Sequence, residues 1–75
     1  MKKSYYLKTK LLKKKFKKIG KNCLISSKAS FIGEKNISLG NEVRIDDYCV
    51  IVAFDGNISI GSNTHICALT YILGS

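Results

Sequence analysis

Residues 39–51 read LGNEVR-IDDYCV-I, and residues 60–72 read IGSNTH-ICALTY-I. In both stretches an aliphatic residue recurs at every sixth position: Leu39, Ile45 and Ile51, then Ile60, Ile66 and Ile72. A smaller residue follows four of these at the fourth position: Val43, Cys49, Thr64 and Thr70. Six-residue spacing scatters residues around a helix but keeps them on one face of an extended chain. The pattern therefore predicts short strands separated by regular corners.

The same step occurs earlier, between Ile25 and Phe31, and it is interrupted twice. Leu39 follows Phe31 after eight positions, and Ile60 follows Ile51 after nine, across the turn-like residues 54–57. Proline is absent, so glycine and asparagine must make the corners. We predict an all-β coil in which the aliphatic residues stack as interior layers.

Charge is divided unevenly along the 75 residues, whose formal net charge is +8. Ten lysines lie within residues 1–21, which contain no acidic residue, whereas residues 22–75 carry a net negative charge. We therefore expect two parts, a basic cap over residues 1–20 and a repeat domain over residues 21–75.

If residues 4–19 are helical, the residues on one stripe are Tyr5, Leu12, Phe16 and Ile19. Our preferred interpretation is a short amphipathic α-helix that covers the end of the coil. Contact of its lysines with an anionic membrane surface is a possible addition. Nucleic-acid binding has only the charge in its favour, and we do not expect it. No apolar run is long enough for a membrane span or a signal peptide, so we expect a cytoplasmic protein, with a peripheral site at the inner membrane face as the addition.

Three cysteines, Cys23, Cys49 and Cys67, form no metal-binding or disulfide pattern, and we expect buried thiols and no metal site. The single histidine, His65, lies two residues before Cys67, but no third residue completes a nucleophile and base arrangement.

The segments LGNEVR (39–44), IDDYCV (45–50) and IGSNTH (60–65) resemble consecutive repeats of the hexapeptide-repeat, left-handed β-helix acyltransferases. Within that group, residues 37–49 and 60–66 resemble bacterial sugar and polysaccharide O-acetyltransferases. The resemblance covers roughly residues 20–75 and implies a triangular parallel β-helix and a homotrimer. Family members are longer, so it also implies that these residues are an N-terminal fragment, inactive alone.

The activity implied by the resemblance is acetyl transfer from acetyl-CoA to a sugar hydroxyl of a surface glycan or its precursor. A family histidine acts as the general base, and His65 is the candidate here for the base or for a contact with the acyl donor. In many family members the base is a different histidine in a later coil. A surface or corner histidine satisfied by backbone is an alternative of at least equal weight. Asp46 and Asp47 match the family pattern and are the candidates for sugar binding, or they cap a turn. Arg44 is a candidate for a CoA phosphate, or it is solvated. No residue identifies the sugar or the CoA site.

A second function fits the same sequence. The lysine-rich segment would act as a non-catalytic module that binds an anionic surface, and the short coil would oligomerise it. A steep salt response without CoA binding would distinguish this module from a transferase.

Overall fold

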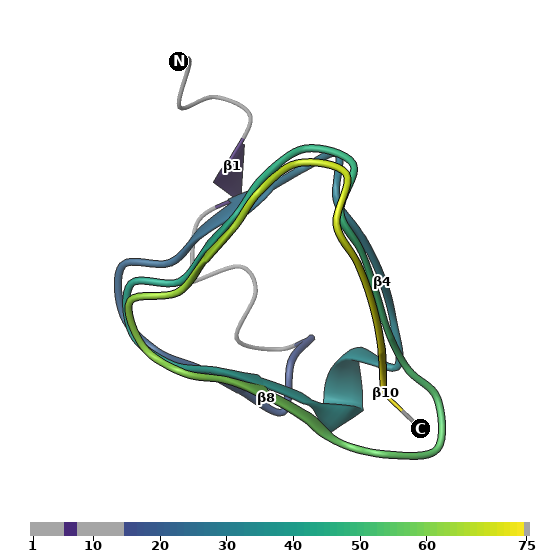
Figure 1. The fold of residues 1–75 in the computed structure, drawn as a ribbon. Helices are drawn as coiled ribbons and strands as arrows, with labels where there is room; N and C mark the ends of the chain where they lie inside the picture. The colour runs from purple at the N-terminus through teal and green to yellow at the C-terminus, as the bar shows by residue number, and fades with distance from the viewer. Residues whose placement is uncertain (1–5, 8–14, 75) are drawn as a thin grey trace.

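The computed structural model describes residues 6–7 and 15–74, and most of them wind into a three-sided coil of short strands, seen along its axis in Figure 1. Each side of the coil is one sheet, named here A, B and C. Sheet A contains, in order, β1 (Tyr6–Leu7), β3 (Leu24–Ser26), β6 (Arg44–Ile45) and β9 (His65–Ile66). Sheet B contains β2 (Lys18–Ile19), β5 (Ile37–Leu39) and β8 (Ile58–Ile60). Sheet C contains β4 (Ser30–Ile32), β7 (Val50–Ala53) and β10 (Tyr71–Gly74).

The predicted aliphatic layers are present as one column behind each sheet. In register, the columns are Ile25, Ile45 and Ile66 in sheet A; Ile19, Leu39 and Ile60 in sheet B; and Phe31, Ile51 and Ile72 in sheet C. All pairs between these strands are parallel, and the middle residue of each column is buried. The stacked coil predicted from the spacing of six and the parallel β-helix implied by the resemblance are therefore confirmed.

Both interruptions of the repeat fall at the same corner, between sheets C and B. In the first full coil this corner holds a 3-10 helix, η2 (Glu34–Asn36), and in the next it holds the longer loop 54–57. The Asn36 side chain donates a hydrogen bond to the Ala53 carbonyl of the neighbouring coil at 3.2 Å. Extra residues at a corner leave the columns in register, because they protrude from the coil instead of shifting the strands.

Most of the other corners contain a left-handed backbone, which side chains other than glycine and asparagine adopt at a cost. Among the described residues, those at such corners are Asn22, Glu42, Tyr48, Asn63 and Leu69, with φ between 56 and 67°. Each lies three positions after an interior residue, and the peptide groups of successive corners bond to each other, as in Asn63 N to Asn41 O at 2.9 Å. The corner after β3 differs, because Lys28 at the same position does not have a positive φ.

The helix predicted within residues 4–19 is not present in the residues that the structure describes. Tyr6–Leu7 is strand β1, antiparallel to β3, and Lys18–Ile19 is strand β2, parallel to β5. Residues 1–5 and 8–14, the rest of that prediction, lie outside the described residues. The physical reason is that the extended chain gains an apolar contact that a helix would not have. Ile19 is the first residue of the interior column of sheet B. Parallel pairing thus begins at Lys18, before the boundary expected at residue 21.

Phe16, which the helix hypothesis placed on the same stripe, closes the end of the coil instead. Its side chain is buried, and its ring meets that of Phe31 edge-to-face at a centroid separation of 5.0 Å. Packing of this kind adds stabilisation beyond the buried area. Phe16 therefore covers this end of the coil from a bend in the chain.

Two of the three cysteines are buried, as predicted, and one is not. Cys23 and Cys49 stand four positions after an interior residue and donate weak hydrogen bonds, for example from Cys49 Sγ to the Cys67 carbonyl at 3.0 Å. Cys67 is exposed, because it directly follows Ile66 and so points outward.

Candidate functional site

The outer faces of the three sheets differ in chemistry, although their inner faces are alike. Sheet C carries exposed apolar side chains, with Ile32 on β4 and Tyr71 and Leu73 on β10. The outward positions of sheet B are mostly serine and glycine: Ser38, Ser59, Gly20, Gly40 and Gly61. Sheet A carries Arg44 and His65, and Asp46 follows β6 directly. Sheet B carries the exposed Lys18 on β2. The one cluster of ionisable side chains on the described strands and their ends is therefore on sheet A.

Asp46 joins Arg44 and His65 into one cluster across two coils. Its Oδ1 accepts a hydrogen bond from Arg44 Nε at 2.8 Å, and its Oδ2 lies 2.7 Å from His65 Nε2. The parallel register sets Arg44 beside His65, which brings both side chains to the carboxylate that follows Ile45. Asp46 is the most covered of the three, with 17% of its side chain exposed, against 49% for His65. The cluster thus has a held carboxylate and an accessible imidazole.

This geometry holds the imidazole of His65 through one of its ring nitrogens. When His65 is neutral, its Nε2–H donates to Asp46, and Nδ1 is then the ring nitrogen with a lone pair. An imidazole held by a carboxylate is the usual arrangement of a general base. The histidine is not held by backbone at a corner: it lies in strand β9 and contacts a side chain.

Asp47, the second predicted sugar-binding residue, faces a different environment. Its Oδ1 accepts a hydrogen bond from the hydroxyl of Ser26, which is 1% exposed. The same serine oxygen accepts the backbone N–H of Lys28 at 3.0 Å. Asp47 thus fixes the corner after β3, so the structure brings Asp46, but not Asp47, to the histidine.

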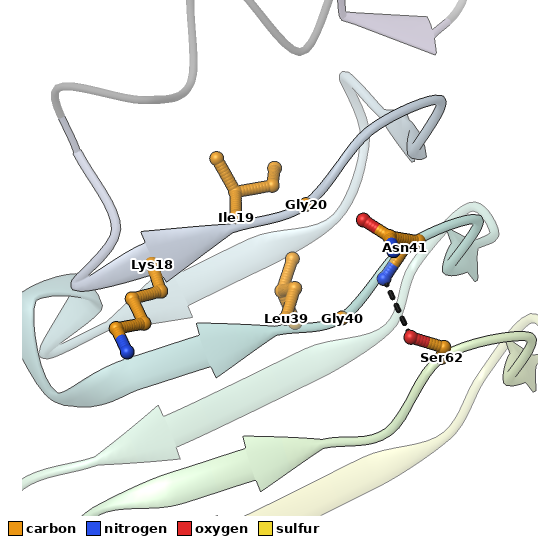
Figure 2. Close-up of a pocket in the computed structure, with 7 residues that line it drawn as sticks. All are labelled: Lys18, Ile19, Gly20, Leu39, Gly40, Asn41 and Ser62. Atoms are coloured by element: carbon orange, nitrogen blue, oxygen red, sulfur yellow. Dashed lines mark hydrogen bonds between the residues drawn. The ribbon is translucent and has the colours of Figure 1, made fainter.

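A second feature is a hollow of about 460 Å³ at the corner that follows sheet B, shown in Figure 2. Its lining consists of Lys18, Ile19, Gly20, Leu39, Gly40, Asn41 and Ser62. The polar side chains at the corner form a ladder between coils: Asn41 Oδ1 accepts from Lys21 N at 2.9 Å, and Ser62 Oγ accepts from Asn41 N at 2.8 Å. Sequence reasoning did not find this hollow. Its signal is the recurrence of glycine directly after Ile19, Leu39 and Ile60.

Within residues 6–7 and 15–74, no three His, Cys, Asp or Glu side chains are grouped so that they would hold a metal ion. The same residues include no helix with the length and apolar character needed to cross a membrane.

Comparison with known proteins identifies relatives of the chain, although no family model matches it. Over 59 residues it is 52% identical to the dTDP-4-amino-4,6-dideoxy-D-glucose acyltransferase of Escherichia coli. The matched stretch is 79% of this chain and 31% of that protein. Two similar solved structures are mutants of AntD, an N-acyltransferase from Bacillus cereus. The one in complex with dTDP-4-amino-4,6-dideoxyglucose and coenzyme A has a TM-score of 0.81 at 44% identity. The one in complex with dTDP and coenzyme A has a TM-score of 0.79 at 46% identity.

Each of these two structures covers 89% of this chain, which in turn covers 35% of the solved chain. The chain therefore spans about a third of the length of the relatives it matches. The resemblance of the repeats to the hexapeptide-repeat acyltransferases is therefore confirmed by similarity in sequence and in fold to sugar acyltransferases.

Proposed function

We propose that this coil is part of an acyltransferase that moves an acyl group from acyl-CoA to the amino group of a dTDP-linked amino sugar. The observation that carries the proposal is the held imidazole of His65 on a coil 44% identical to a protein solved with such a sugar and coenzyme A. The acceptor differs from the sugar hydroxyl predicted from the repeats, because the similar AntD proteins are N-acyltransferases. For the donor, acetyl-CoA is the predicted choice within the acyl-CoA class.

In the proposed step, the sugar amine attacks the thioester carbonyl. A C–N bond forms, the C–S bond breaks, and coenzyme A leaves as its thiolate. Nδ1 of His65 accepts the proton that the attacking nitrogen loses and passes it to the thiolate, so that coenzyme A is released as its thiol. Asp46 acts as a positioning residue, because it fixes the ring, and Arg44 fixes Asp46.

The test is an assay of the full-length protein with acetyl-CoA and dTDP-4-amino-4,6-dideoxyglucose, in which coenzyme A release and the product are both measured. We expect an amide, which alkaline hydroxylamine leaves intact. An ester, which alkaline hydroxylamine cleaves, would establish O-acylation instead, and absence of turnover with this acceptor would reject the proposal.

Variants test the proposed roles of His65 and Asp46. His65→Ala is expected to lower kcat about 100-fold or more, the usual contribution of a general base. Asp46→Asn is expected to lower kcat less, with KM unchanged, and Asp46→Glu to restore part of the loss. Full turnover in His65→Ala would show that another residue is the base.

We also propose a homotrimer located in the cytoplasm, where acyl-CoA is available. Light scattering coupled to size-exclusion chromatography tests the assembly, and a monomer at working concentration would contradict it.

A second candidate function is binding of an anionic membrane surface, and it rests on the basic segment. Lys15, Lys17, Lys18 and Lys21 are all exposed. Among the described residues, the ion pairs involve Asp46 and none of these lysines. Each basic residue near an anionic lipid surface contributes about 1 kcal/mol. Vesicles with phosphatidylserine should bind the protein with a steep salt dependence, and neutral vesicles should not.

A further inference from the structure

We infer that the hollow at the corner after sheet B binds a phosphate group, of the diphosphate kind that a sugar nucleotide or coenzyme A carries (Figure 2). This inference rests on the proposed function for the source of the phosphate. Its physical basis is separate from the His65 cluster and consists of the donors, the glycines and the charge around the hollow.

The described lining of the hollow offers hydrogen-bond donors and includes no acidic residue. Lys18 contributes an exposed ammonium group. Ser62 Oγ accepts a bond from the Asn41 backbone, so its own hydroxyl hydrogen is left to donate. Asn41 Oδ1 accepts from Lys21 N, which makes its amide nitrogen the end with hydrogens to offer. A lining that offers such donors and no carboxylate favours an anion.

Glycines keep these donors uncovered. A Cβ at Gly40 would lie 2.6 Å from Ser62 Oγ, and one at Gly20 would lie 2.3 Å from Asn41 Oδ1. Any side chain at these positions would therefore displace the polar ladder and fill the space beside it. A backbone without side chains also lets a ligand approach closely.

Charge and size are both suitable for a phosphate compound. Lys17 and Lys21 are exposed next to the lining residues Lys18 and Gly20 along the chain, and they raise the local positive potential. The volume of about 460 Å³ is within the range of roughly 300 to 1,000 Å³ typical of small-molecule sites.

Calorimetric titration of the full chain with inorganic pyrophosphate, dTDP and coenzyme A tests the site. Wild type is expected to bind pyrophosphate, and Lys18→Gln to weaken that binding roughly tenfold, as loss of one charge-assisted bond implies. Ser62→Ala should weaken it less, and Lys18→Arg should keep most of it. Lys35→Gln, which removes the same charge from η2 outside the lining, is the control and should bind like wild type.

The two nucleotides identify the source of the phosphate. If Lys18→Gln weakens dTDP but not coenzyme A, the site takes the sugar nucleotide, and the reverse result assigns it to the acyl donor. Absence of pyrophosphate binding in wild type, or unchanged affinities for all three probes in folded Lys18→Gln, would overturn the inference. Phosphate binding that depends on Lys18 in a protein without acyl transfer would reject the proposed function and leave the site standing.

Discussion

The inside and the outside of this coil obey different rules. Inward positions repeat almost the same residue in every coil, as Ile25, Ile45 and Ile66 do in sheet A. At the outward position next to them, the same strands carry Leu24, Arg44 and His65, with no repetition at all. The difference shows that the repeat specifies the shape, whereas the outward positions are free to hold a polar cluster on one sheet and an apolar surface on another.

Neighbouring residues of β6 provide the strongest test of this contrast. Ile45 is fully buried, and Ile45→Ala should lower the free energy of unfolding by about 3 kcal/mol, because a cavity adds to the lost transfer energy. Arg44→Ala, one position away, should cost less than about 1 kcal/mol, since its ion pair is partly exposed and screened. Urea unfolding followed by circular dichroism measures both, and equal losses would contradict the contrast.

Two glycines at the corner after sheet B, Gly40 and Gly61, compare a position covered by the next coil with a position that has open space beside it. A Cβ at Gly40 would meet the Ser62 backbone N at 2.6 Å, so Gly40→Ala should cost about 2 kcal/mol through overpacking. Gly61 holds the equivalent position one coil later, but nothing lies within 4 Å of its Cβ position. Gly61→Ala is therefore the matched control, and it should leave the urea midpoint unchanged or raise it slightly.

The adjacent carboxylates extend the contrast to polar groups. Asp47→Ala should cost about 1 to 2 kcal/mol, because it removes the acceptor of the buried Ser26 hydroxyl. Asp46→Ala should cost less than about 1 kcal/mol, since its partners are partly exposed. Thermal and urea unfolding of the two variants compare them directly. A larger loss for Asp46 would mean that the Arg44 and His65 cluster supports the fold.

Much of the fold was predictable, because interior residues leave a simple trace in the sequence. The spacing of six identified the columns that hold Leu39, Ile45 and Ile51, and these residues are buried as expected. The prediction of a helix for the basic segment was wrong in the described residues, since Phe16 and Ile19 are compatible with a helical stripe as well as with the end of a coil. Only the presence of Phe31 and Leu39 as partners decides between them.

The candidate site was predictable only in part. His65 and Asp46 were selected, but their contact depends on the register between coils, which is set by how many extra residues the corner between sheets C and B contains. Asp47 looks equivalent to Asp46 in the sequence, and its bond to Ser26 appears only when the coils are stacked. The exposure of Cys67, in contrast, was predictable from the repeat, because Cys67 comes directly after the interior residue Ile66.

The smallest expected effect concerns a corner between strands. There the backbone conformation, and neither core packing nor surface chemistry, determines which residue is favourable. Leu69 has φ of 67° and is 80% exposed, so its side chain gains little from burial while its backbone pays for a left-handed conformation. Asparagine adopts that conformation more readily, as Asn22 and Asn63 do at other corners. Leu69→Asn should therefore raise the free energy of unfolding by about 0.5 to 1 kcal/mol. Leu73→Asn, in strand β10 and similarly exposed, is the control, and it should be neutral or slightly destabilising, because asparagine is a poor strand residue. If both variants lose stability equally in urea, the left-handed backbone at residue 69 does not lower the stability of the protein. The loss in Leu69→Asn would then come from the apolar contacts of the leucine side chain.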